Sequence, residues 1–187
     1  MVSLKDIISH LEFENFDKRY IIRGLIDGSL SSLGVVIGAS SGDVSVIIAA
    51  GIGGGVANGI SNILGALTAE RAILEGIRSS QEKVLLKEEG SLKTTLFYKK
   101  ALNKTAVSGI GDGLATTFGS VIPVIPFLFL RKDLAIIIAI IITLVILFGL
   151  GVFIGKISKE NLAMSGLKMV VGGIIVALIS FTIENIF

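Results

Sequence analysis

Two stretches of the sequence repeat one pattern: Asp27-Gly28-Ser29-Leu30-Ser31-Ser32-Leu33-Gly34 and Asp112-Gly113-Leu114-Ala115-Thr116-Thr117-Phe118-Gly119. Each places a carboxylate beside a glycine, hydroxyl side chains four and five residues later, and a second glycine after seven. Both stretches lie in long apolar segments, where a carboxylate at the centre of a membrane helix costs about 2.5–3.5 kcal/mol. Such residues normally face a polar pathway, so Asp27 and Asp112 are predicted functional residues. In the alternative interpretation each only hydrogen-bonds a hydroxyl of its own helix, Ser31 or Thr116.

The composition predicts a polytopic membrane protein. Apolar residues make up 52% of the chain and charged residues 17%, and several apolar runs approach or exceed the about 18 residues that a membrane helix needs. The 23 glycines favour close packing of helices in lipid. Cysteine is absent, which excludes disulfides, thiolate metal sites and cysteine nucleophiles. The net charge of +2 is too small to indicate nucleic-acid binding, and no cleavable signal peptide is expected.

The order of apolar and charged segments predicts an all-α chain with five transmembrane helices. Residues 1–20 form an amphipathic helix at the membrane surface, and residues 21–69 form the first two transmembrane helices. Residues 70–104 form a charged helical insert, and residues 105–187 form three more transmembrane helices. The third is expected over 105–130, with a kink at Pro123 and Pro126. The chain is thus predicted to contain two helical hairpins in parallel, with the insert between them, and a fifth helix.

The basic residues predict the orientation in the membrane. With the amino terminus in the cytosol, every Lys and Arg faces the cytosol except Arg131 and Lys132. The insert is then cytosolic and the carboxyl terminus lies outside. The first and third helices both leave the cytosolic side, so Asp27 and Asp112 are expected at similar depth in parallel helices.

The first two helices carry further polar and small residues at helical spacing. Asn58 and Asn62 lie four residues apart, and either hydrogen-bond a neighbouring helix or line a polar site. Small residues recur every fourth position on one face of each helix, which predicts two surfaces of helix contact, at least one of them between subunits. These are Gly24, Gly28 and Ser32 on the first helix and Gly51, Gly55 and Gly59 on the second.

Acidic residues recur every seventh position in the insert. Glu75, Glu82 and Glu89 are expected to share one helical face, with Glu70 five residues before Glu75. Two interpretations remain open. The face is either solvated and paired with nearby basic residues, or it offers oxygen ligands to a hard cation.

The first helix resembles that of the vacuolar iron transporter family, in Arg23-Gly24-Leu25-Ile26-Asp27-Gly28 and Gly34-Val35-Val36-Ile37-Gly38. Pro123-Val124-Ile125-Pro126 looks like the proline pair of the family's third helix, and the five-helix layout with an insert is similar. The resemblance covers roughly residues 20–187 and suggests a divergent prokaryotic-type member. It implies a homodimer in a prokaryotic cell membrane that exports ferrous iron and related divalent metals in exchange for protons. The metal path would run between the first and second helices of both subunits, with Asp27 as a ligand.

The second helix departs from the family pattern Ser-Met-x-x-Gly-Glu. This chain has Asn62 where the family has Met and Ala66 where it has Glu. Loss of the thioether removes the ligand best suited to softer metals, and Asp112 could replace the missing charge. The predicted metal ligands are therefore oxygen donors: Asp27, Asp112, Asn62, Asn58, Ser31, Glu70, Glu75, Glu82 and Glu89.

The predicted function is transport of divalent cations, iron or manganese, out of the cytosol. No covalently bound cofactor is expected, because the metal is the substrate, and the chain is not expected to be an enzyme. One alternative is an intramembrane aspartyl protease, because Gly109-Ile110-Gly111-Asp112 satisfies the Gly-x-Gly-Asp pattern and Asp27 could supply the second carboxylate. The other alternative is a membrane scaffold that transports nothing.

Overall fold

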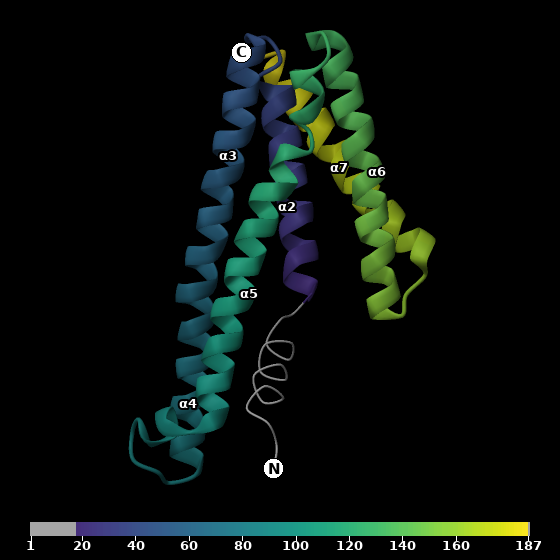
Figure 1. Ribbon diagram of the computed structural model, residues 1–187. Coiled ribbons are helices and arrows are strands. Elements are labelled where there is room, and N and C mark those ends of the chain that lie inside the picture. The colour runs from purple at the N-terminus through teal and green to yellow at the C-terminus, as the bar shows by residue number, and fades with distance from the viewer. Residues whose placement is uncertain (1–17, 187) are drawn as a thin grey trace, which may run out of the picture.

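The computed structural model describes residues 18–186 and is built from helices (Figure 1). The predicted surface helix over residues 1–20 lies outside the described residues, except for its last three. The elements are α2 (Lys18–Gly38), α3 (Val44–Gly65), the π-helical turn η1 (Ala66–Glu70), α4 (Arg71–Val84), the 3₁₀ turn η2 (Ser91–Thr94), α5 (Leu96–Val121), the 3₁₀ turn η3 (Ile125–Leu128), α6 (Lys132–Ser158) and α7 (Leu162–Glu184). The described residues contain no strand, which confirms the all-α prediction.

Among the described residues, four segments are long and apolar enough to cross a membrane: Arg19–Gly38, Val44–Val84, Lys132–Ser158 and Leu162–Glu184. They confirm the prediction of a polytopic membrane protein. The helix predicted as the third span, α5, is more polar, because it carries three lysines in its first half and Asp112 in its second. It packs against both α2 and α3 (Figure 1). Protein neighbours rather than lipid therefore cover the polar residues of its second half, including Asp112.

Helices α2 and α5 run in the same direction (Figure 1), and their glycine contacts place the two Asp-Gly stretches side by side. A Cβ atom added to Gly24 would overlap the backbone carbonyl of Asp112, and one added to Gly28 would overlap that of Thr116. Likewise, a Cβ atom on Gly119 would lie 2.6 Å from the carbonyl oxygen of Leu25. The glycines thus let the two backbones approach, with α2 and α5 offset by about one helical turn.

The glycine face of α3 also packs against α5. Cβ atoms added to Gly55 and Gly59 would overlap the side chains of Ser120 and Thr117. One added to Gly51 would lie 2.6 Å from Val124 Cγ2. Both predicted small-residue faces are therefore contact surfaces within one subunit, which corrects the prediction that at least one lies between subunits.

Pro123 and Pro126 end the helix rather than kink it. The chain leaves α5 at Val121 and turns through η3 into α6. A proline lacks the N–H that would continue the helix and its ring clashes with the preceding turn, so two prolines three residues apart stop it. Val124 and Phe127 of this turn are buried in an apolar cluster with residues of α2, α3 and α6: Val36, Ile47, Ala135 and Ala139.

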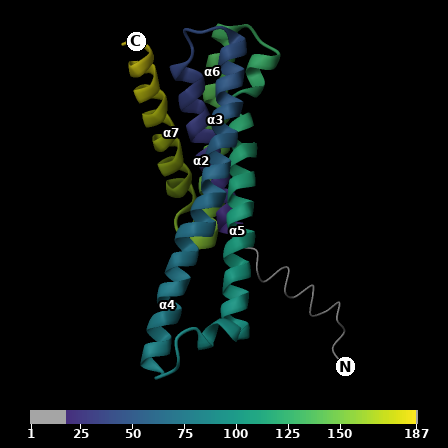
Figure 2. The ribbon, with the colours of Figure 1, turned by 90° about the vertical axis from the view of Figure 1, so that its left-hand side faces the viewer.

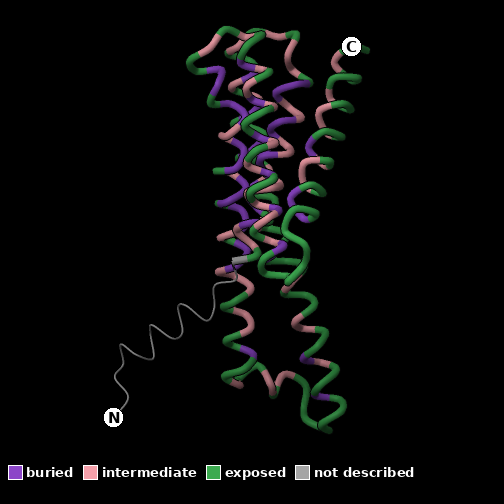
Figure 3. The backbone as a smooth tube through the Cα atoms, turned by 90° about the vertical axis from the view of Figure 1, so that its right-hand side faces the viewer, coloured by how far each residue is buried: buried purple, intermediate pink, exposed green. Residues whose placement is uncertain are grey.

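The predicted insert is largely an extension of two helices. Val44–Val84 is one continuous helix of 41 residues through η1, and α5 begins at Leu96 within the predicted insert. Figure 2 shows α4 and the first half of α5 projecting beyond the start of α2. Figure 3 shows that this projection is mostly exposed, whereas the buried residues concentrate in the bundle above it. The apolar part of the long helix is α3, so the charged α4 extends outside the membrane-spanning bundle.

Candidate functional site

Asp27 lies on α2 opposite two asparagines of α3. Asn58 Nδ2 donates a hydrogen bond to Asp27 Oδ2 at 3.1 Å, and Asn62 Nδ2 donates to the same oxygen at 2.8 Å. Asn58 Nδ2 also lies 3.1 Å from Ser31 Oγ, and the Ser31 hydroxyl donates to the Asp27 carbonyl at 2.7 Å. The structure therefore brings together Asp27, Ser31, Asn58 and Asn62, four of the predicted site residues.

A fifth residue, Thr116 of α5, joins these four and completes what we call the Asp27 cluster. Asn62 Nδ2 donates to Thr116 Oγ1 at 2.9 Å, and the Thr116 hydroxyl donates to the Asp112 carbonyl at 2.9 Å. The sequence pattern indicates Thr116 only as a partner within its own helix. The repeat nevertheless holds a signal for this role, because Thr116 occupies the position in the second copy that Ser31 occupies in the first.

Asp112 does not share this cluster through its carboxylate. The side chain is fully buried and forms an ion pair with Arg23, whose Nε lies 3.3 Å from Oδ1 and whose Nη2 contacts Oδ2. The guanidinium also lies over the Tyr20 ring, 4.9 Å from its centroid. The two carboxylates therefore have separate partners, and Asp112 is placed as the buried half of an α2–α5 ion pair. This role of Arg23 could be found only from the register of α2 against α5.

Glu70 lies near the same end of α2. The Tyr20 hydroxyl donates to Glu70 Oε1 at 3.0 Å, which ties the start of α2 to the junction of α3 and α4. Glu70 is half-buried there. Its partner is a tyrosine rather than another carboxylate of the predicted set.

Glu75 and Glu82 bind the parts of the projection together. Glu75 accepts hydrogen bonds from the Tyr98 hydroxyl and, at 2.8 Å, from Arg78 Nε. Glu82 is buried, contacts Arg78 and accepts the backbone N–H groups of Gly90 at 2.9 Å and Leu92 at 2.8 Å. Both carboxylates therefore have internal partners that hold α4, the following loop and α5 in place.

These contacts explain the protonation of the two carboxylates. The Tyr98 hydrogen bond and then the Arg78 hydrogen bond lower the pKa of Glu75 below its ordinary value of 4.5. Burial opposes ionisation of Glu82, but the backbone bonds from Leu92 and Gly90, with Arg78, outweigh it and lower the pKa of Glu82. Both side chains are thus stabilised as anions by protein groups.

Glu89 lies outside the helical face on which it was predicted. Helix α4 ends at Val84, and the loop that follows contains two residues with positive φ, Leu86 at 50° and Gly90 at 83°. Only Glu75 and Glu82 share a face of α4, and Glu89 is exposed in the loop. Within residues 18–186, no three His, Asp or Glu side chains converge to hold a metal ion. The predicted cation-binding face of the insert is therefore not assembled.

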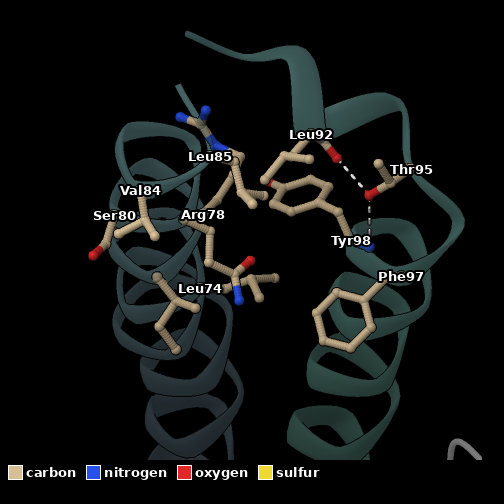
Figure 4. A pocket seen from close by; sticks show the side chains of 11 residues that line it. Leu74, Arg78, Ser80, Val84, Leu85, Leu92, Thr95, Phe97 and Tyr98 are labelled. Atoms are coloured by element: carbon tan, nitrogen blue, oxygen red, sulfur yellow. Dashed lines mark hydrogen bonds between the residues drawn. The ribbon is translucent and has the colours of Figure 1, made fainter. Parts of the chain in front are cut away.

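The projection contains a cavity of about 470 Å³ between α4 and α5 (Figure 4). Apolar side chains form most of its wall, including Leu74, Val84, Leu85 and Phe97. The side chain of Thr95 caps α5 here by accepting the backbone N–H of Tyr98 at 3.3 Å. This apolar wall does not suit a cation, so the Asp27 cluster remains the candidate site.

The Asp27 cluster offers one carboxylate and several neutral oxygens. In the present arrangement both amides direct N–H groups at Asp27. A half-turn of each carboxamide would direct Oδ1 to the same point and provide neutral ligands for a cation. Together with the hydroxyls of Ser31 and Thr116, the cluster can supply an all-oxygen coordination shell between α2, α3 and α5.

Comparison with known proteins gives two matches. The family model described as the VIT family matches residues 71–185, which is more than half of the chain. An uncharacterised protein of Methanocaldococcus jannaschii is 59% identical over 186 residues, covering 99% of this chain and 97% of the relative. The family match covers α5, which holds Asp112 and Thr116 of this chain, and the match to the archaeal relative also covers α2 and α3.

Proposed function

The chain belongs to the VIT family, whose members are metal ion transporters, and we propose that it exports Fe²⁺ or Mn²⁺ from the cytosol in exchange for protons at Asp27. The observation that carries this proposal is the convergence of Asn58 and Asn62 on the half-buried Asp27 carboxylate within a membrane-spanning bundle. A carboxylate in such a place normally belongs to an ion or proton pathway.

The side chains of the Asp27 cluster favour the binding of a hard or borderline cation. The Asp27 cluster contains no sulfur and no imidazole, and its members are a carboxylate, two carboxamides and two hydroxyls. Oxygen ligands suit Mn²⁺, Mg²⁺ or Ca²⁺ as well as Fe²⁺. A single carboxylate leaves a divalent ion only partly neutralised, which favours release over permanent binding.

In this proposal the metal ion and the proton bind the same carboxylate, that of Asp27, so the protein exchanges one for the other. A metal ion binds only the deprotonated carboxylate, so metal entry displaces any proton held by Asp27. After the metal leaves, protonation would restore a neutral cluster. Asp112 takes no part in this exchange, because Arg23 already neutralises its carboxylate.

The exposed face of α3 supports the proposal of a homodimer. Small residues recur there every fourth position, at Gly53, Ala57, Ser61 and Gly65, and all four are exposed. Small residues on a membrane helix allow a second helix to approach closely. Asn58 and Asn62 directly follow two members of this stripe, so a second α3 would lie next to the Asp27 cluster of the first.

The contacts of the two aspartates do not favour a protease. An aspartyl protease needs two carboxylates that share a proton. Here Arg23 binds Asp112, while Asn58 and Asn62 bind Asp27. No contact among the described residues supports a scaffold role over transport.

Flux measurements in proteoliposomes test the proposal. Fe²⁺, Mn²⁺, Co²⁺ and Ca²⁺ uptake would be followed with and without an imposed pH gradient, for the wild type and for Asp27→Asn. We expect flux that the gradient accelerates and that Asp27→Asn abolishes. Asp43→Asn is the matched control, because it removes a carboxylate at the α2–α3 turn, away from the Asp27 cluster, and should leave flux intact. Metal flux that persists in Asp27→Asn would refute Asp27 as the transport site.

A further inference from the structure

Two cavities share a pair of arginines at one end of the bundle. The first, which we call the apolar cavity, measures about 320 Å³ and lies between α2, α6 and α7. Its lining comprises Arg19, Arg23, Ile26, Ile154, Ile157, Ser158 and Met169. The second, which we call the open cavity, measures about 300 Å³ and is lined by Arg19, Tyr20 and Arg23. The two arginines therefore line both the apolar cavity and the more open space beside it.

Both cavities lie at the level where the apolar helices end. The apolar run of α6 stops at Lys156, and α7 begins at Leu162 after a polar connection. Arg19 and Arg23 occupy the first turns of α2 beside this connection. This end of the spans is where hydrocarbon gives way to headgroups and water.

Positive charge concentrates around the cavities. Arg19 and Arg23 line both, and α6, α7 and their connection carry Lys156, Lys159 and Lys168 at the same end. Lys168 pairs with Glu160 at 3.6 Å. Arg23 uses its Nε and Nη2 for Asp112, yet its side chain is still 59% exposed. A guanidinium has five N–H donors, so further donors of Arg23 remain for an anion.

We propose that Arg19 and Arg23 bind the phosphate of an anionic phospholipid, one acyl chain of which enters the apolar cavity. The arginine forks match phosphate oxygens, and Ile26, Ile154, Ile157 and Met169 match a hydrocarbon chain. The headgroup then occupies the open cavity beside Tyr20, a residue type enriched at this depth of a bilayer. Basic pockets between membrane helices are known to select anionic headgroups. The inference depends on the chain lying in a membrane and not on which metal it carries.

Native mass spectrometry of the full chain in detergent tests this site. Phosphatidylglycerol and phosphatidylcholine with identical acyl chains would be titrated separately, and inorganic phosphate would be added as a competitor. We expect tighter binding of phosphatidylglycerol. Arg19→Gln should weaken that binding by roughly fivefold, since one arginine near the headgroups contributes about 1 kcal/mol. Ile157→Trp should weaken the binding of both lipids, because the larger side chain fills the apolar cavity.

Matched variants at the opposite end of α6 serve as controls. Arg131→Gln removes an exposed arginine there, and Ile137→Trp enlarges a side chain that faces outward. Both should retain wild-type binding.

Equal affinity for the two lipids, or equal losses in the control variants, would overturn the proposal. Displacement of the lipid by inorganic phosphate at comparable concentration would identify a free phosphate site instead and would also overturn it. Binding of neither lipid to the full chain would also refute the lipid site.

Discussion

At the residue scale, Asn62 connects three helices through one nitrogen atom. Its Nδ2 donates to Asp27 on α2 and to Thr116 on α5, while Asn62 itself lies on α3. A cation that takes Asn62 Oδ1 as a ligand must break both bonds. Metal binding at Asp27 would therefore loosen the link between α3 and α5, which gives the site a direct route to helix movement.

The role of Asn62 predicts a particular kinetic change. Asn62→Ala removes a neutral ligand and the link to Thr116, so we expect lower apparent metal affinity by about tenfold, or about 1.4 kcal/mol, with flux retained at high metal. Asn62→Met would restore a ligand, but a soft one, and should shift selectivity toward Co²⁺ over Mn²⁺. Competition among these ions in proteoliposomes measures both effects. Unchanged affinity and selectivity in both variants would exclude Asn62 from the coordination shell.

The ion pair of Arg23 and Asp112 predicts unequal effects of its two halves on stability. Arg23→Gln leaves a fully buried carboxylate without its partner, which costs about 3–5 kcal/mol. Asp112→Asn leaves a guanidinium that is 59% exposed and can be hydrated, so it should cost less. The double variant should recover part of the loss. Unfolding in detergent, followed by circular dichroism, compares the three, and a larger loss for Asp112→Asn would contradict this account.

At the scale of elements, the close approach of α2 and α3 to α5 organises the bundle. Glycines of both helices face α5, and Ser120 fills the space that a side chain at Gly55 would need. The opposite face of α3 carries the exposed small-residue stripe with Gly53 and Ala57. One helix thus has an inner face for its own subunit and an outer face for the proposed partner.

Two leucine substitutions distinguish the roles of the inner and outer faces of α3. Gly55→Leu must displace Ser120 and α5, so we expect a severe loss of thermal stability in the subunit itself. Ala57→Leu projects outward, and should weaken the dimer while the subunit keeps its fold. Light scattering in detergent measures the mass of the complex, and thermal unfolding in detergent measures the stability of the subunit. A full dimer with Ala57→Leu would rule out this stripe as the interface.

The projection of α4 and α5 should respond to acid. Because the folded-state pKa of Glu82 is lowered, its ionised form contributes stability at neutral pH. That contribution is lost as the pH falls below the ordinary value of 4.5 and through the lower folded-state value. The protection factors of the Gly90 and Leu92 amides, taken relative to the intrinsic exchange rate at each pH, should therefore fall in acid. Glu82→Gln should lower these protection factors already at pH about 7. Glu89→Gln, in the exposed loop, is the matched control and should change neither amide.

At the scale of the whole molecule, hydropathy predicts most of the helices because lipid contact requires apolar side chains. Hydropathy is weakest as a guide at α5, where α2 and α3 cover the buried polar residues Asp112, Thr116 and Ser120. The prediction of a kink at the end of α5 is wrong, because a sequence does not show whether the chain continues in line or reverses after Pro123. Charge spacing likewise cannot reveal that Glu82 binds Gly90 and Leu92, since those contacts require a loop that folds back.

Part of the candidate site can also be predicted from the sequence, because the apolar surroundings constrain its polar residues. Asp27, Asn58 and Asn62 can be identified because polar residues in apolar helices need partners, and the structure shows that they are partners of one another. The pairing of Asp112 with Arg23 is not predictable in this way. It depends on the one-turn offset between α2 and α5, which the glycine contacts set.

Exchange of a metal ion for a proton at Asp27 is the central claim. The most direct measurement is proton release on addition of Mn²⁺ or Fe²⁺ to the purified protein in weak buffer, between about pH 5.5 and 8. We predict proton release that disappears in Asp27→Asn, while Asp112→Asn retains it. Metal binding without proton release at any pH, or with the same release in Asp27→Asn, would contradict this claim.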